Sequence, residues 1–120
     1  NNEIPCYKVA ETENCFAFLD INPNAEGHTL CIPKQEVDNL FDLDTKLYNE
    51  LMMFSKKVAK ALKKAIPCER VAMSVIGLEV PHAHVHLIPI NKMKDVTFRN
   101  KVTFSKNEFQ DIANNIKSYL

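Results

Sequence analysis

A histidine occupies every second position in the stretch Pro81-His82-Ala83-His84-Val85-His86-Leu87. Successive side chains of a β-strand point to opposite faces of the sheet, so in a strand over residues 80–90 the three imidazoles share one face. Ala83, Val85 and Leu87 then point the other way, where we expect the helices to pack. The apolar face explains why this strand forms, but it does not explain three imidazoles in a row.

The three histidines admit three interpretations: a polar sheet face without a chemical task, a metal site, or a phosphate site. For a metal, His82 and His84 can share an ion because positions two apart on a strand are about 6.6 Å apart, whereas His82 and His86 are about 13 Å apart. The sequence also contains no His-Glu-x-x-His pattern. For a phosphate, the central imidazole acts as the nucleophile while its neighbours donate to phosphoryl oxygens.

The composition limits the class of protein. The chain has 120 residues and a formal net charge of zero, from 15 basic and 15 acidic side chains. This length predicts one domain over residues 1–120. The balanced charge argues against a nucleic-acid partner, because such proteins normally carry a basic excess. Gly27 and Gly77 are too few for a dinucleotide-binding fingerprint and wrongly spaced for a P-loop. If the protein binds a phosphate, it must therefore hold it without a glycine-rich loop.

Two further features concern the cellular environment. No stretch approaches the roughly 18 consecutive apolar residues of a membrane-spanning helix, so we expect no membrane partner. The four cysteines, Cys6, Cys15, Cys31 and Cys68, include no C-x-x-C pair. Each stands in an apolar or strand-like context, which predicts buried free thiols and a reducing, cytoplasmic location.

The rest of the chain alternates between strand and helix patterns. Short β-prone runs at residues 6–9, 15–20, 28–32 and 71–76 join the histidine stretch to give five predicted strands. Apolar residues at spacings of three and four predict a helix over residues 45–65, capped by Asp42 or Asp44. Ser105 and Glu108 form a capping box that begins a second helix. We therefore predict an α+β domain with a five-stranded antiparallel sheet and two main helices.

The histidine stretch, continued through Ile88, matches the signature His-x-His-x-His followed by apolar residues. Four other segments follow the same family's amino-terminal pattern in order and spacing. On these motifs the sequence resembles the histidine triad (HIT) superfamily, and in particular its small Hint-like bacterial branch, over nearly the whole chain. The four segments are Glu3-Ile4-Pro5, Ala17-Phe18-Leu19-Asp20-Ile21-Asn22-Pro23, Gly27-His28-Thr29-Leu30 and Ile32-Pro33-Lys34.

The resemblance implies a homodimer whose sheets continue into each other and a nucleotide hydrolase or nucleotidyl transferase acting at an α-phosphate. Family substrates are nucleoside phosphoramidates or dinucleoside polyphosphates. The implied nucleophile is His84, which forms a nucleotidyl-histidine intermediate. The backbone carbonyl of His82 orients the ring of His84, His86 donates to the phosphate, and His28 is a fourth histidine near the site.

The resemblance also implies a nucleoside site for a purine nucleotide or nucleotide conjugate. Asp20 and Ile21 hold the nucleoside, with the carboxylate accepting from the ribose hydroxyls, and Phe18 and Leu19 line the base pocket. We expect no cofactor and no metal. Bacterial relatives with structural zinc carry a C-x-x-C and a histidine shortly after Ile-Pro-Lys, where this chain has Gln35-Glu36.

The sequence departs from the family just before the triad. Many members carry Gln, Ser or Thr there, whereas this chain has Leu78 and Glu79. A carboxylate beside a phosphate repels it, so Glu79 turns away, protonates a leaving group or marks a changed substrate. The alternative function is therefore a nucleotide-binding interaction or regulatory protein with weakened or lost catalysis.

Overall fold

The structure is a computed structural model that describes residues 6–120. The segment Glu3-Ile4-Pro5, which contributes to the family resemblance, lies outside the described residues. The elements in chain order are β1 (Lys8–Glu11), β2 (Cys15–Leu19), β3 (Thr29–Pro33), a 3₁₀ turn η1 (Leu40–Asp42), α1 (Thr45–Ala65), β4 (Arg70–Ser74), β5 (Val85–Ile90), a second 3₁₀ turn η2 (Met93–Val96) and α2 (Lys106–Lys117).

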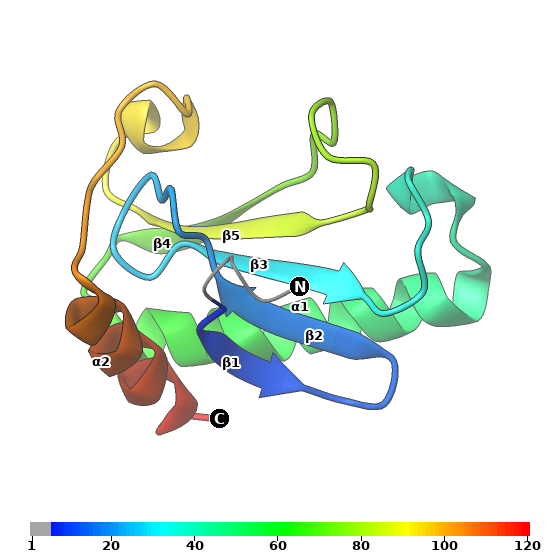
Figure 1. Ribbon diagram of the computed structural model, residues 1–120, viewed down its shortest axis with the longest axis horizontal. Helices are drawn as coiled ribbons and strands as arrows, with labels where there is room; N and C mark the ends of the chain where they lie inside the picture. Colours follow the sequence, from blue (N-terminus) through cyan, green and yellow to red (C-terminus); the bar gives the residue numbers. More distant parts are fainter. Residues whose placement is uncertain (1–5) are drawn as a thin grey trace.

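The five strands form one sheet in the order β1-β2-β3-β5-β4, and every neighbouring pair is antiparallel. Helix α1 packs against β2, β3, β4 and β5, while α2 packs against β1, β2 and α1. Figure 1 shows α1 running across one face of the sheet and α2 beside it near β1. The predicted α+β class with an antiparallel five-stranded sheet is confirmed.

Alternation along the strands separates the two faces of the sheet. In β2, Cys15, Ala17 and Leu19 are buried, whereas Phe16 and Phe18 are half-buried. The buried set joins the core that α1 and α2 complete. Leu51, Val58 and Leu62 of α1 are fully enclosed there. One face of the sheet is therefore an apolar core, and the opposite face is left for other contacts.

Both helices begin where their caps predict. The carboxylate of Asp44, rather than that of Asp42, accepts from the backbone N–H of Leu47 at 2.8 Å and starts α1. Ser105 and Glu108 form the reciprocal capping box of α2. The side-chain oxygens satisfy N–H groups that the first helical turn leaves without partners.

The prediction of one strand over residues 80–90 is wrong at its start, because β5 begins at Val85. Its neighbour β4 ends at Ser74, which is paired with His86, so no β4 backbone is available to pair with residues 80–84. Pro81 also has no N–H to donate to a ladder. His82 and His84 therefore precede the strand, and of the three histidines only His86 lies on its face.

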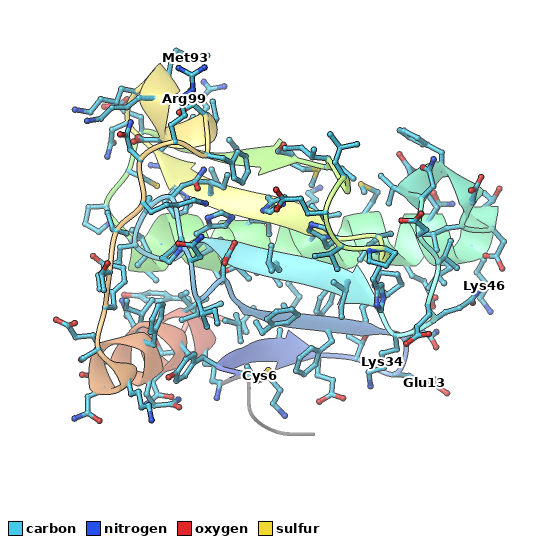
Figure 2. The ribbon with its side chains drawn as sticks, turned by 45° about the horizontal axis from the view of Figure 1, so that its top comes forward. Cys6, Glu13, Lys34, Lys46, Met93 and Arg99 are labelled. Atoms are coloured by element: carbon cyan, nitrogen blue, oxygen red, sulfur yellow. The ribbon has the colours of Figure 1, made fainter. Side chains whose placement is uncertain are left out.

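The other strand boundaries move by smaller amounts, since β1 covers Lys8–Glu11 and β4 covers Arg70–Ser74. The four cysteines are free thiols, as predicted, but only Cys15 and Cys31 are buried: Cys68 is half-buried, and Cys6, which precedes β1, is exposed (Figure 2). Among residues 6–120, no helix combines the length and the apolar character needed to cross a membrane.

Candidate functional site

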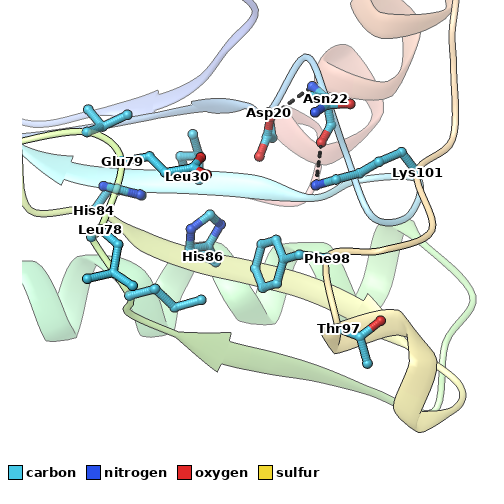
Figure 3. A pocket seen from close by; sticks show the side chains of 13 residues that line it. Asp20, Asn22, Leu30, Leu78, Glu79, His84, His86, Thr97, Phe98 and Lys101 are labelled. Atoms are coloured by element: carbon cyan, nitrogen blue, oxygen red, sulfur yellow. Dashed lines mark hydrogen bonds between the residues drawn. The ribbon is translucent and has the colours of Figure 1, made fainter.

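A pocket of about 500 Å³ lies on the sheet face opposite the helices. Its floor includes Leu30 of β3 and His86 of β5, which are directly paired. Asp20 and Asn22, which follow β2, form one wall, and residues 76–80 together with His84 form another. Figure 3 shows these side chains converging from segments far apart in the sequence.

His84 is held by a backbone contact. Its Nδ1 lies 2.7 Å from the carbonyl oxygen of His82, so this nitrogen carries the hydrogen and donates to that carbonyl. The hydrogen bond leaves the lone pair on Nε2, in a side chain that lines the pocket. The ring of His82 itself donates from Nε2 to the carbonyl oxygen of Pro33 at 2.8 Å and does not line the pocket.

His28 and His86 form a second fixed pair. The backbone N–H of Asn24 donates to Nδ1 of His28 at 2.9 Å, which requires the hydrogen of His28 to be on Nε2. That Nε2–H donates to Nδ1 of His86 at 3.0 Å. Neutral His86 therefore carries its own hydrogen on Nε2, so that this N–H is the donor it offers the pocket.

Burial keeps both of these rings neutral at pH 7. The side chain of His28 is enclosed, and desolvation lowers its pKa to about 3, with the neighbouring His86 as a smaller cause. Desolvation also lowers the pKa of His86 to about 4. The pair therefore supplies a hydrogen-bond donor to the pocket without supplying a positive charge.

Asp20 lies at the end of β2 and faces the same pocket. Its Oδ1 accepts from the backbone N–H of Asn22 at 2.8 Å, and its Oδ2 lies 3.6 Å from Nε2 of His28. The shorter contact of His28 is to His86, so Asp20 receives only a weak interaction from that ring. Burial raises the pKa of Asp20, while the Asn22 hydrogen bond and the charge of Lys101 act in the opposite direction.

The other residues expected to hold a nucleoside differ in their placement. Phe18 lies opposite Leu30 and is half-buried on the pocket side of the sheet, with its ring packed on Phe16. Ile21 is 46% exposed. Leu19 is buried in the core and does not line the pocket, because adjacent strand residues point to opposite faces.

Two residues before the triad, Leu78 and Glu79, also line the pocket. Both are exposed, and the side chain of Leu78 is 89% accessible. Figure 3 shows them on the same side of the pocket as His84. Glu79 therefore contributes a carboxylate to the same pocket as the histidine whose Nε2 is free.

Sequence reasoning missed several residues in and around the site, among them Asn24, Phe98 and Lys101. Phe98 has a φ of 63°, which is uncommon for a bulky side chain, and its ring lies 4.9 Å from that of His86. Lys101 lies 4.9 Å over the ring of Phe98. Residues 92–103 show neither strand nor helix periodicity, and Asn24 lies in the loop-forming run Asn22-Pro23-Asn24, so no local pattern marks these contacts.

The described residues include one group that could bring three metal ligands together, namely Asp20, His28 and His86. The donor atoms are already used, however. Nε2 of His28 carries a hydrogen that it donates to Nδ1 of His86, and a metal would need lone pairs on both atoms. The chemistry of this group fits a hydrogen-bonded pair better than a metal site.

Comparison with known proteins gives a consistent result. The sequence model of the HIT domain family matches residues 1–93. An uncharacterized HIT-like protein of Borreliella burgdorferi is 35% identical over 122 aligned residues, which cover 94% of this chain and 88% of that protein. Adenosine 5'-monophosphoramidase HNT1 of Saccharomyces cerevisiae is 41% identical over 91 residues, which cover 73% of this chain and 56% of that protein.

Solved structures show the same fold. The crystal structure of a HIT-like protein from Bartonella henselae superposes with a TM-score of 0.85 at 31% identity and covers 99% of this chain and 90% of that one. A hypothetical histidine triad nucleotide-binding protein from Sulfolobus tokodaii gives a TM-score of 0.85 at 28% identity, with 98% of this chain and 85% of that one covered.

Proposed function

Because the chain belongs to the HIT family, we propose that it is a nucleotide hydrolase or nucleotidyl transferase that acts at the α-phosphate of a nucleoside phosphoramidate or dinucleoside polyphosphate. Two relatives are named adenosine 5'-monophosphoramidases, which supports adenosine 5'-phosphoramidate as the first substrate to test. Asp20, His28, His84 and His86 meet in or behind one pocket, and this grouping supports chemistry on a bound nucleotide.

The proposed reaction has two displacements. Nε2 of His84 attacks the α-phosphorus and the bond from phosphorus to the leaving group breaks: the nitrogen of a phosphoramidate departs as an amine with a proton from solvent, and the oxygen of a polyphosphate departs as a phosphate anion. Water then attacks the nucleotidyl-His84, the bond from phosphorus to Nε2 breaks, and the nucleoside monophosphate is released with return of a proton. Division into two steps replaces one difficult displacement by two easier ones.

The single observation that carries this proposal is the 2.7 Å hydrogen bond from Nδ1 of His84 to the carbonyl oxygen of His82. It selects the tautomer with a free lone pair on Nε2. When Nε2 bonds to phosphorus, the ring gains positive charge, and the same carbonyl then accepts a stronger, charge-assisted hydrogen bond. The contact therefore stabilises the intermediate more than the free enzyme.

His86 complements this nucleophile. Its Nε2–H donates to an oxygen of the phosphoryl group, and the bond strengthens as negative charge develops there. Asp20 accepts from the ribose hydroxyls, while Phe18 and Ile21 lie beside the base of a purine nucleotide. Leu19 is left out of this assignment because its side chain belongs to the core.

The test is release of AMP from adenosine 5'-phosphoramidate, measured by chromatography. His84→Asn should lower the rate at least 1,000-fold, an order of magnitude typical for loss of a catalytic nucleophile. His82→Asn is the matched control, because it makes the same replacement two positions away and keeps the backbone carbonyl. It should retain activity within about tenfold, since only the bond to Pro33 is lost. An active His84→Asn protein would refute the nucleophile assignment.

The second candidate function is nucleotide binding without efficient catalysis. Leu78 and Glu79 favour it, because both line the pocket where family members carry polar groups that contact phosphate. Tight binding of AMP by a protein that turns over neither phosphoramidates nor dinucleoside polyphosphates would establish this alternative. Measurable turnover of either substrate class would reject it.

We also propose that the protein is a homodimer in which β4 pairs with its symmetry mate. β4 is an edge strand, and the apolar side chains of Met73, Val75 and Ile76 are exposed along and beyond it. An exposed apolar edge is a site at which another strand can add. Sedimentation velocity should give a dimer, and Met73→Lys should shift it toward the monomer. A wild-type monomer at micromolar concentration would contradict this proposal.

A further inference from the structure

Lys101 contributes a positive charge to the pocket, and the roles proposed for the three histidines give this charge no function. Among the described residues that line the pocket, it is the only lysine or arginine, whereas Asp20 and Glu79 both carry carboxylates. His86 adds no positive charge at pH 7, because its pKa is about 4. Lys101 also lies beyond residue 93, where the match to the sequence model of the HIT domain ends. Its role therefore needs an explanation from this chain's own structure.

The ammonium group of Lys101 is held in place on three sides. Its Nζ donates to Oδ1 of Asn24 at 2.8 Å and to the carbonyl oxygen of Asn22 at 3.1 Å, and it lies 4.9 Å over the ring of Phe98. Asn24 is itself buried and donates from its side chain to the carbonyl of Asp95 at 2.9 Å. The side chain thus loses little further freedom when it binds a ligand.

Within residues 6–120, the structure gives acceptors to two of the three N–H groups of Lys101. A lysine ammonium has three donors and no acceptor. Because the side chain lines the pocket, the remaining N–H is available to a bound molecule. Figure 3 shows Lys101 reaching from the 97–101 segment toward Asn22, next to Asp20.

Asn22 joins Lys101 to Asp20. The backbone N–H of Asn22 donates to Oδ1 of Asp20 at 2.8 Å, while its carbonyl oxygen accepts from Lys101 at 3.1 Å. One residue therefore sets a pure acceptor and a pure donor side by side on the same wall. A cis-diol is complementary to such a pair, because each of its hydroxyl groups donates one hydrogen bond and accepts others.

We propose that Lys101 is a second ribose-binding residue, which donates to an oxygen of the ribose cis-diol while Asp20 accepts from the diol's hydroxyl hydrogens. This inference rests on the proposed function, since it assumes a nucleotide in the pocket. It adds a substrate class: the site selects ribonucleotides over deoxyribonucleotides. A nucleotide without the contacted hydroxyl leaves the ammonium without its third acceptor, which weakens binding.

The experiment measures binding of AMP, 2'-deoxy-AMP and 3'-deoxy-AMP by isothermal titration calorimetry. Wild-type protein should bind AMP about tenfold more tightly than at least one deoxy analogue, as expected for loss of a charged hydrogen bond. Lys101→Met should weaken the binding of AMP about tenfold and leave the affinity for that same deoxy analogue unchanged. Lys94→Met is the matched control, because Lys94 is exposed on the same segment and does not line the pocket. It should change none of the three affinities.

Two outcomes overturn the proposal while leaving the proposed function intact. If Lys101→Met weakens the binding of AMP and of both deoxy analogues by the same factor, Lys101 does not contact the ribose and acts only by positioning Asp20 or by stabilising the fold. If it weakens none of them, Lys101 does not touch the ligand. Failure of wild-type protein to bind AMP would instead reject the proposed function together with this inference. A thermal melt of Lys101→Met, matched to wild type, excludes unfolding as the cause of lost binding.

Discussion

Nε2 of His28 donates to Nδ1 of His86 across 3.0 Å, and both rings are buried. The backbone N–H of Asn24 fixes the tautomer of His28, and His28 in turn fixes the tautomer of His86. The loop after β2 therefore determines that neutral His86 offers an N–H to the pocket. This relay works only while both rings remain neutral, which makes it sensitive to acid.

The stability of the protein should fall on acidification below pH 6.5. Burial lowers the pKa values of His28 and His86 to about 3 and about 4, so the unfolded chain takes up protons that the folded protein does not. This contribution to stability is fully present above pH 6.5. Below it, the unfolding free energy should drop by about 1.4 kcal/mol per pH unit for each histidine, until the folded pKa is reached.

Urea unfolding at pH 7.5, 6.0 and 5.0 measures this effect. His86→Asn removes one of the two titrating rings. In this variant the unfolding free energy should fall with decreasing pH at roughly half the rate of the wild-type protein. Asp20 acts in the opposite sense at the acid end, because burial raises its pKa and the folded protein there takes up a proton first. A stability that is constant or rises between pH 7.5 and 5.0 would show that the two rings are not buried as neutral groups.

Gly27→Ala should destabilise the fold more than Gly77→Ala. Both glycines have positive φ, +89° and +71°, so either replacement costs about 1–2 kcal/mol in backbone strain. At Gly27 a Cβ would also lie 2.9 Å from Cγ1 of Ile66 and 3.3 Å from Cγ of Pro89, whereas at Gly77 it meets nothing within 4 Å. We expect the crowding at Gly27 to lower the unfolding free energy by a further amount of about 1–3 kcal/mol, and urea denaturation measures this difference. Equal losses would contradict the packing of Ile66 against this turn.

Glu79→Gln should change the choice of leaving group. The Glu79 carboxylate lines the pocket on the side of His84, where it repels an anionic polyphosphate leaving group but not the uncharged amine released from a phosphoramidate. Because the side chain is exposed, the effect is screened, and we expect cleavage of diadenosine tetraphosphate to rise only about two- to fivefold. Turnover of adenosine 5'-phosphoramidate should not rise.

Glu13→Gln is the matched control for this charge change, since Glu13 is exposed in the β1–β2 turn far from the pocket lining (Figure 2). Steady-state rates with both substrates are the measurement. If Glu79→Gln alters both substrates by the same factor, its carboxylate has no part in distinguishing leaving groups.

Local patterns predicted the parts of the fold that local physics determines. Apolar spacing and the carboxylate of Asp44 defined α1, and the capping box at Ser105 defined the start of α2. The start of β5 was wrong because residues 80–84 find no ladder partner: β4 ends too early, and beside β3 the N–H of Ala83 donates to Val37 while the His82 ring takes the carbonyl of Pro33. The length of β5 therefore depends on its neighbouring strands, and the alternating histidines carry no information about where those strands end.

In the candidate site, too, some residues were predictable from local sequence motifs and others were not. The triad spacing and the Asp20 and His28 motifs were visible in the sequence, and the structure brings His84, His86 and Asp20 to one pocket with His28 behind it, whereas the ring of His82 lies outside. Lys101 and Phe98 were invisible, because their roles arise from contacts with residues more than ten positions away. Leu19 was assigned to the base pocket by resemblance, although alternation in β2 already set it opposite to Phe18.

The most direct test of the central claim is to locate the adenylyl group during turnover. Wild-type protein is mixed with excess adenosine 5'-phosphoramidate, quenched at alkaline pH within milliseconds to keep the phosphorus–nitrogen bond, and digested for peptide mass spectrometry. The account predicts an adenylyl group on His84, formed before AMP accumulates at the steady-state rate. Steady release of AMP with the adenylyl group on another residue would contradict it.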